Sequence, residues 1–122
     1  MMNNVYNLLN DIRKCPALYL GHPSVSLLEA FIHGYLYDKK ESDAESCHFM
    51  HCFSIYVKQM YIERYNLRTQ HGWAQLIEFF NGKGMDAING FYKILDKFVE
   101  EKGWETINPD IHALFDCNDD DE

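Results

Sequence analysis

The sequence contains no long apolar run. No stretch of its 122 residues approaches the roughly 20 consecutive apolar positions that a membrane-spanning helix needs. The first 14 residues, MMNNVYNLLNDIRK, also lack the basic start, apolar core and small-residue cleavage site of a secretory signal. We therefore expect a cytoplasmic protein with no membrane contact, in which Cys15, Cys47, Cys52 and Cys117 stay reduced.

Basic residues are few. The chain has 11 Lys and Arg against 19 Asp and Glu, a net charge of −8. This balance argues against direct nucleic-acid binding, which depends on basic side chains that replace the counterions of phosphates. It leaves two interpretations open. The charge can serve solubility alone, or its field can attract a basic partner.

Motifs for nucleotide binding and catalysis are also missing. The sequence has no GxxxxGK[ST], GxGxxG, GxSxG or HExxH. Its neighbouring carboxylates lie in polar runs, where solvent keeps their pKa values together, whereas acid–base catalysis needs two separated values. We therefore expect neither an enzyme nor a bound cofactor.

Apolar residues recur at helical spacing along most of the chain. This spacing predicts five helices, over residues 5–12, 26–37, 49–61, 73–80 and 88–99. A short sixth helix is expected at residues 111–115, after Asn108–Pro109, and no strand-like alternation competes with these patterns. The sequence thus predicts an all-α domain of five to six helices over residues 1–116, in bundle-like or orthogonal packing, with an acidic tail at 117–122.

Several residues indicate where these helices begin and pack. Pro16 should end the first helix, because proline lacks an N–H and disfavours helical backbone in the residue before it. The second helix can begin with a capping box of Ser26 and Glu29, or with Ser24 as the cap. Gly90 lies inside the fifth helix, where glycine costs up to about 1 kcal/mol relative to alanine. Its presence there indicates close packing against another helix.

The apolar stretch KCPALYLGHPS, residues 14–24, lies between the first two helices. It is too short for an ordinary helix. We interpret it as a packed connector in which Ala17, Leu18 and Leu20 insert under the bundle while Tyr19 faces the other way.

The run CHFMHC, residues 47–52, offers metal-ligand chemistry. On a helix Cys47 and His51 share one face, as do His48 and Cys52. Thiolate and imidazole are zinc ligands, but each face supplies only two, and a tetrahedral site needs more. Other donors exist, although no spacing selects among them: His22, His33, His71, His112 and Cys117. A Cys–His nucleophile is a second alternative. We favour ordinary packing for these side chains, with no metal bound.

Several segments resemble a motif set of small bacterial proteins. The segment RKCPALYLG (residues 13–21) is similar to the pattern R-x-R/C-P-A-M/L-Y-L-G, and SLLEAFIHGYLY (26–37) follows it as the pattern requires. FSIYV (53–57), GWAQLI (72–77) and AINGFYKILDKF (87–98) match later segments of the set. The resemblance covers about residues 8 to 100. It is to immunity proteins of bacterial toxin systems, including those of contact-dependent growth inhibition.

This resemblance implies a non-enzymatic inhibitor that binds the toxic domain of a cognate effector. It transfers no catalytic residue and no contact position. The acidic balance suits a basic toxin such as a nuclease, since charge steers fast association. The candidate contact residues are the acidic side chains of two segments, namely Asp38, Glu41, Asp43, Glu45, Asp110, Asp116, Asp119 and Asp120. The alternative is a helical regulatory or scaffolding module that acts through homo-oligomerisation, and a Cys/His metal-binding protein is less favoured.

Overall fold

The computed structural model describes residues 3–65 and 71–106, with the side chains of 105 and 106 excepted. Every regular element in these ranges is a helix. In chain order they are α1 (Asn4–Lys14), α2 (Pro16–Leu20), α3 (Val25–Leu36), α4 (Ala44–Tyr65), α5 (Trp73–Asn81), α6 (Met85–Glu100) and α7 (Gly103–Thr106). The all-α prediction is confirmed. The expected helix at residues 111–115 and the tail at 117–122 lie outside the described residues.

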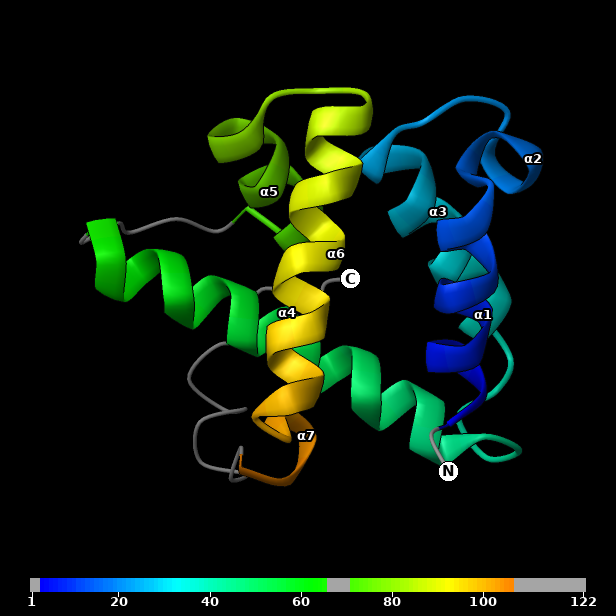
Figure 1. Cartoon of the computed structure of the whole chain (residues 1–122). Coiled ribbons are helices and arrows are strands. Elements are labelled where there is room, and N and C mark those ends of the chain that lie inside the picture. Colours follow the sequence, from blue (N-terminus) through cyan, green and yellow to red (C-terminus); the bar gives the residue numbers. More distant parts are fainter. Residues whose placement is uncertain (1–2, 66–70, 107–122) are drawn as a thin grey trace.

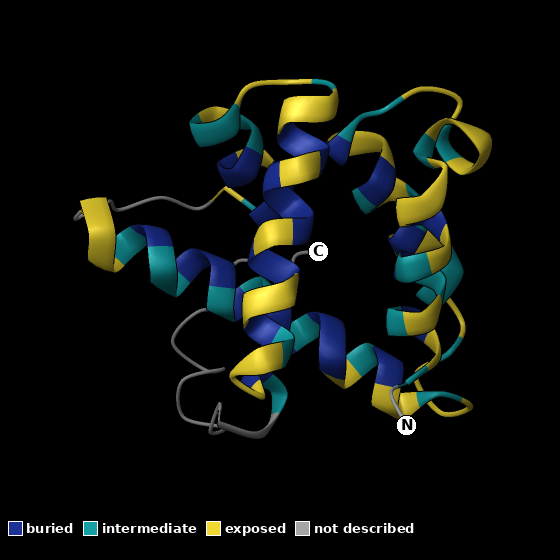
Figure 2. Cartoon of the chain, in the orientation of Figure 1, coloured by how far each residue is buried: buried dark blue, intermediate teal, exposed yellow. Residues whose placement is uncertain are grey.

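The long helix α4 organises the packing. Figure 1 shows α4 running across α6, with α1 beside its beginning and α5 beside its later turns. The faces that these helices turn toward one another are buried, and their outer faces are exposed (Figure 2). One apolar core therefore joins residues from α1, α3, α4, α5 and α6.

Aromatic rings fill the centre of this core. Phe49 and Phe53 of α4 meet Phe98 of α6 edge to face, with ring centroids 5.2 and 5.4 Å apart. Phe53 also meets Phe91 at 5.4 Å. These tilted contacts place the positive edge of one ring on the negative face of the next, which favours them over face-to-face stacking.

The first helix ends before Pro16, as the sequence predicts, and Asn3 caps its start. The Asn3 side chain accepts a hydrogen bond from the Tyr6 backbone N–H at 2.9 Å, which satisfies one free donor of the first turn. Val5, Leu9 and Ile12 form the buried face. The helix ends before Pro16, which occupies the first position of α2, where its missing N–H costs nothing.

The interpretation of residues 14–24 as an inserted connector is wrong. Pro16–Leu20 is a short helix that ends at Gly21, whose φ of 88° favours glycine. Leu18 is 76% exposed and Ala17 is also exposed, so neither inserts under the bundle. Leu20 alone of the three packs against the core. A five-residue helix has one narrow face, and no residue of α2 is fully buried.

Two local predictions have opposite outcomes. The capping box at Ser26 is wrong, because the Ser24 hydroxyl accepts the cap hydrogen bond from the Leu27 N–H at 3.2 Å. Ser26 instead donates to Glu78 Oε1 of α5 at 3.1 Å. The close approach at Gly90 is confirmed, since a Cβ there would lie 2.6 Å from Cγ of Asn81. The absence of a side chain lets the end of α5 pack directly on α6.

Candidate functional site

The acidic segment between α3 and α4 lies at the surface. Asp38 and Glu41 are exposed in the connection, and Glu45 is exposed in the first turn of α4. Tyr37, just before them, is 86% exposed, the largest value among the exposed large apolar side chains of the described residues. The segment therefore presents three carboxylates beside one aromatic ring.

Two lysines reduce the charge of this segment. Lys39 donates to the Tyr35 carbonyl at 2.7 Å and stands 4.3 Å from the centre of the Tyr35 ring. Its ammonium is also 3.9 Å from Asp38 Oδ1, and Lys40 is exposed next to it. The acidic character predicted for this loop is consequently weaker than its carboxylates alone imply.

Asp43, the fourth candidate of this segment, is engaged within the fold. Its Oδ1 accepts from the Ser46 backbone N–H at 3.2 Å, and its Oδ2 accepts from Ser46 Oγ at 2.8 Å and Asn4 Nδ2 at 3.1 Å. Hydrogen bonds from Ser46 and Asn4 lower the pKa of this carboxyl. The spacing Asp43-x-x-Ser46 is an N-cap pattern that could have identified this role from the sequence.

The remaining candidates, Asp110, Asp116, Asp119 and Asp120, lie outside the described residues. Their share of the charge follows from the sequence alone. Seven acidic residues and no Lys or Arg come after Lys102, whereas 12 acidic and 11 basic residues come before Glu105. Nearly all of the net charge of −8 therefore belongs to the C-terminal segment and not to the helical core.

The CHFMHC run is divided between two sides of α4. His48 and Cys52 face α7, where His48 Nε2 lies 3.4 Å from Cys52 Sγ and 3.2 Å from the Trp104 carbonyl oxygen. Cys47 and His51 line a groove on another side of the helix. The predicted sharing of faces is thus confirmed for both pairs, but the two pairs do not meet.

The environment of Cys52 disfavours the thiolate, the form in which a cysteine acts as a nucleophile. Burial raises the pKa of Cys52 to about 11, which keeps the thiol protonated near neutral pH. When His48 Nε2 carries the proton, it donates to the Trp104 carbonyl, and the lone pair that remains for the thiol is on Nδ1, 3.9 Å from Cys52 Sγ. Among residues 3–65 and 71–106, no three His, Cys, Asp or Glu side chains are arranged to hold a metal ion.

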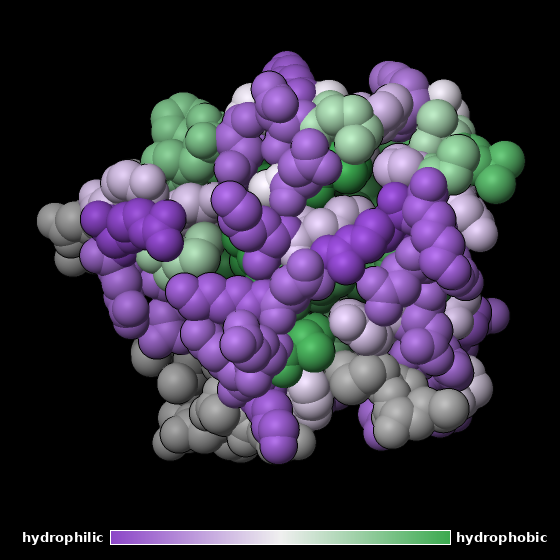
Figure 3. Space-filling model, in the orientation of Figure 1, coloured by the Kyte–Doolittle hydropathy of each residue, from purple (hydrophilic) through white to green (hydrophobic). Residues whose placement is uncertain are grey.

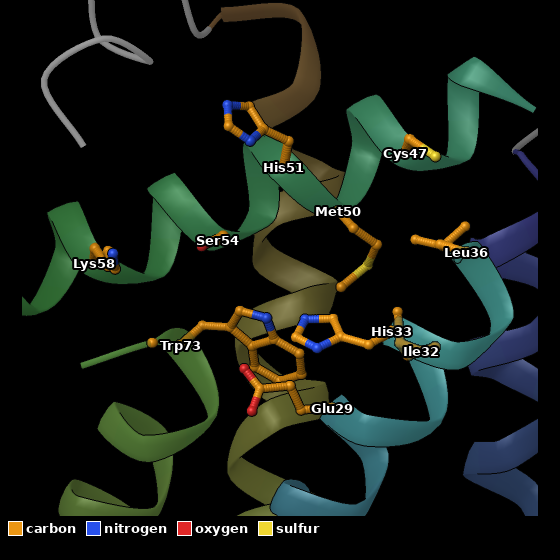
Figure 4. Close-up of a pocket in the computed structure, with 11 residues that line it drawn as sticks. Glu29, Ile32, His33, Leu36, Cys47, Met50, His51, Ser54, Lys58 and Trp73 are labelled. Carbon is orange, nitrogen blue, oxygen red and sulfur yellow. The ribbon is translucent and has the colours of Figure 1, made fainter. Parts of the chain in front are cut away.

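The sequence did not reveal a groove between α3 and α4. It encloses about 510 Å³ and is closed at one end by Gly72 and Trp73, at the start of α5. Figure 4 shows Glu29, His33 and Trp73 around one space, with Met50 projecting toward it from α4. One turn of α3 and successive turns of α4 supply the rest of its lining: Ile32, Leu36, Cys47, His51, Ser54 and Lys58.

Two charged groups line this groove. Lys58 is only 8% exposed, but its ammonium nitrogen reaches water, since no buried side-chain nitrogen or oxygen among the described residues lacks a hydrogen-bond partner. Burial raises the pKa of Glu29, the nearby Glu78 carboxylate raises it further, and His33 lowers it. The α3–α4 groove therefore combines an ammonium group, a carboxyl group that protonates more readily than usual, and an apolar wall.

Comparisons with other proteins add no relative. No family model matches this chain, and no curated protein and no solved structure is significantly similar to it. Among the described helices, none combines the length and apolar character needed to cross a bilayer.

Proposed function

We propose that this protein is an immunity-type inhibitor that binds the basic toxic domain of a cognate bacterial effector in the cytoplasm. The observation that carries the proposal is the segment beside Tyr37, where Asp38, Glu41 and Glu45 are exposed on the surface. Carboxylates around an exposed aromatic ring suit a basic protein surface, because tyrosine supplies buried contact area and the charges steer association. The motif resemblance of residues 8 to 100 supports the same function.

One end of the proposed surface is held in place by hydrogen bonds. Asp43 accepts hydrogen bonds from Asn4 of α1 and from Ser46 in the first turn of α4. The C-terminal end of the acidic loop is therefore held in one conformation. A preorganised loop loses less conformational entropy when it binds. The segment after Lys102 carries most of the net charge and would contribute chiefly to long-range attraction.

The test is binding to the toxic domain encoded beside this gene. We expect a 1:1 complex whose association slows as salt rises, and growth rescue when both are co-expressed. Glu41→Lys should weaken binding, whereas Glu100→Lys, the same charge reversal at the far end of α6, should leave it unchanged. Replacing Asp110, Asp116, Asp119 and Asp120 by Asn should reduce the association rate more than it raises the dissociation rate. Normal binding by all of these variants, or no toxin beside the gene, would contradict the proposal.

The alternative is a helical module that acts as a homo-oligomer. Its supporting observation is the apolar surface of α2 and the first turn of α3, where Leu18 is 76% exposed and Tyr19 and Leu27 are each 38% exposed. Figure 3 shows apolar side chains reaching the surface at the α2 corner of the molecule. Tyr19 packs edge to face on Phe31 of α3, with ring centroids 6.3 Å apart, which joins the exposed side of α2 to α3. A salt-insensitive dimer in sedimentation that Leu18→Glu dissociates would favour this function.

A further inference from the structure

The contact between α3 and α5 carries a line of polar side chains along its edge. Ser26, Glu29 and His33 lie at positions i, i+3 and i+7 of α3, which is the spacing of one helix face. The Ser26 hydroxyl donates to Glu78 Oε1 of α5 at 3.1 Å, so this face meets α5. The polar line therefore places two carboxyl groups, those of Glu29 and Glu78, on facing helices.

Glu29 lies close to the beginning of α5. A Cβ on Gly72, the residue that precedes the first turn of α5, would be 3.4 Å from Glu29 Oε2. In Figure 4 the Glu29 carboxyl and the Trp73 ring border the same space. Glu29 and Glu78 are both half-buried, so their carboxyl groups are partly removed from the water that would stabilise their charges.

Two like charges in such a place favour the uptake of a proton. Burial raises the pKa of Glu29 above its ordinary value of 4.5, His33 lowers it, and the Glu78 carboxylate raises it again, with a net rise. The fully ionised pair is therefore the less favourable state of this contact. Protonation of Glu29 removes the repulsion from Glu78, while Glu78 continues to accept the hydrogen bond from Ser26.

The other elements around Glu29 contribute few charges. The groove into which Glu29 projects is also lined by three ionisable side chains of α4: Cys47, His51 and Lys58. The ion pairs within residues 3–65 and 71–106 do not join Lys58 to Glu29 or Glu78. His71 lies just before α5, and Tyr19 of α2 packs on Phe31 of α3. The buried face of α6, which packs on both helices, contains no Asp, Glu, Lys, Arg or His: Ala87, Ile88, Gly90, Phe91, Tyr92, Ile94, Leu95 and Phe98.

We propose that the Glu29–Glu78 pair makes the α3–α5 contact responsive to protons: the start of α5 is held against α3 when Glu29 is protonated and is loosened when both carboxyl groups are ionised. Loosening of the first turn of α5 exposes Trp73, which is 5% exposed in the structure, and opens the closed end of the α3–α4 groove. The pair is separate from the acidic surface beside Tyr37, so this proposal and the proposed function can each fail without the other.

The first test is the pH dependence of stability. Below about pH 4.5 Glu29 is protonated in the folded and unfolded states, whereas above its raised folded-state pKa it is ionised in both, and ionisation destabilises the folded state. Stability is therefore lost as pH rises from 4.5 through the folded-state pKa of Glu29. The urea midpoint of Glu29→Gln should rise relative to the wild type over this range, because glutamine does not ionise. Glu100→Gln, an exposed change on α6, is the matched control and should follow the wild type.

Glu78→Gln tests the carboxyl group on α5. Its amide oxygen can still accept the Ser26 hydroxyl, but the charge that raises the pKa of Glu29 is gone. We expect the stability of this variant to depend less on pH than that of the wild type. Near neutral pH, Glu29→Gln and Glu78→Gln together should change the urea midpoint by less than the sum of their separate effects, because either one removes the repulsion. Simple additivity would contradict the pairing.

The second test reports on the start of α5 itself, through acrylamide quenching of Trp73 fluorescence. The chain has two tryptophans, and Trp104→Phe leaves Trp73 alone while keeping an aromatic ring against Phe49 and Phe98. Quenching should be greater at about pH 8 than at about pH 4.5, because local opening exposes the ring. With Glu29→Gln in the same background it should stay low at both values, although every histidine is still present. Equal quenching at the two pH values, a pH dependence that persists in Glu29→Gln, or no relative rise of the Glu29→Gln urea midpoint in the chain with both tryptophans would each overturn the proposal.

Discussion

Ser46 donates its hydroxyl to Asp43 at 2.8 Å and accepts a hydrogen bond from the Val5 N–H at 3.0 Å. This fully buried hydroxyl therefore connects the cap of α4 to the first turn of α1, 41 residues away. The contact fixes both the N-terminal helix and the end of the acidic loop. A residue proposed as part of a binding surface, Asp43, is thus also part of the fold.

Ser46→Ala should destabilise the protein by about 1–3 kcal/mol, because it leaves the Val5 N–H without its acceptor in a buried position. The measurement is the free energy of unfolding in urea. Ser42→Ala, an exposed change in the same connection, is the control and should stay within about 0.5 kcal/mol of the wild type. Equal stability of the two variants would mean that the Val5 bond is replaced by water.

Asp43→Asn should change how stability depends on pH. Hydrogen bonds from Ser46 and Asn4 lower the folded-state pKa of Asp43 from its ordinary value of 3.8, so ionisation favours the folded state. This contribution is present above pH 3.8 and is lost as pH falls through the lower folded-state value. Asparagine still caps the helix but does not ionise.

The melting temperatures of wild type and Asp43→Asn should therefore converge as pH falls below about 4, with the wild type higher near neutral pH. Thermal unfolding followed by circular dichroism gives the comparison. Glu41→Gln, in the same loop, serves as the control for charge alone. A difference that stays constant from neutral to acid pH would show that the hydrogen bonds, and not the charge, stabilise this cap.

Gly90→Ala and Gly34→Ala should have opposite effects, although both replace a glycine inside a helix. At Gly90 the new methyl group would lie 2.6 Å from Asn81 Cγ, whereas at Gly34 no heavy atom lies within 4 Å. We expect Gly90→Ala to destabilise by about 1–3 kcal/mol through overpacking. Gly34→Ala should stabilise by up to about 1 kcal/mol through helix propensity.

Both effects can be measured as changes in the free energy of unfolding. In Gly90→Ala, the additional change Asn81→Ala removes the obstructing side chain but also its hydrogen bonds to Tyr61 and Ile77. The loss in the double variant should therefore be smaller than the sum of the two single losses. Simple additivity would mean that the helices move apart and that no clash persists.

These glycines also show what the sequence could and could not predict. Gly90 was informative because glycine lowers the stability of a helix, so its presence in a clear helix indicates a close contact. That contact is with the Asn81 side chain. The helices themselves follow from apolar spacing, which reports burial directly. The choice between Ser24 and Ser26 as cap could not be made this way, because both fit the local pattern and Glu78 of a distant helix engages Ser26.

The sequence could not predict the α3–α4 groove. Its lining comes from two helices and the start of a third, and no local pattern specifies which faces oppose each other. From the sequence alone, Lys58 is expected to be an ordinary surface lysine, because no neighbouring residue in the sequence indicates that its side chain is buried. The only available signal was the polar stripe of Cys47, His51, Ser54 and Lys58 along a helix that is otherwise deeply buried.

The cysteines should differ strongly in reactivity. Cys15 is exposed, Cys47 is half-buried and Cys52 is buried. Burial also raises the pKa of Cys52 from 9.0 to about 11, which reduces its thiolate fraction roughly 100-fold. Among these three described cysteines, alkylation by iodoacetamide at slightly alkaline pH, followed by peptide mass analysis, should modify Cys15 first and Cys52 last.

His48 gives this prediction its control. If His48 acted as a base for Cys52, alkylation of Cys52 would be fast and would slow in His48→Ala. If the imidazole serves only to contact the Trp104 carbonyl, His48→Ala should leave Cys52 slow or expose it slightly through loosening of α7. Rapid, His48-dependent alkylation would restore the nucleophile hypothesis.

Lys58→Met should change the free energy of unfolding by less than about 1 kcal/mol, because methionine keeps the buried stem of the side chain and removes only an ammonium group that reaches water. The measurement is unfolding in urea. Lys93→Met, at an exposed site, is the control and should change the free energy of unfolding by less than about 0.5 kcal/mol. A large loss of stability in Lys58→Met alone would instead assign the ammonium a role in holding α4 against its neighbours.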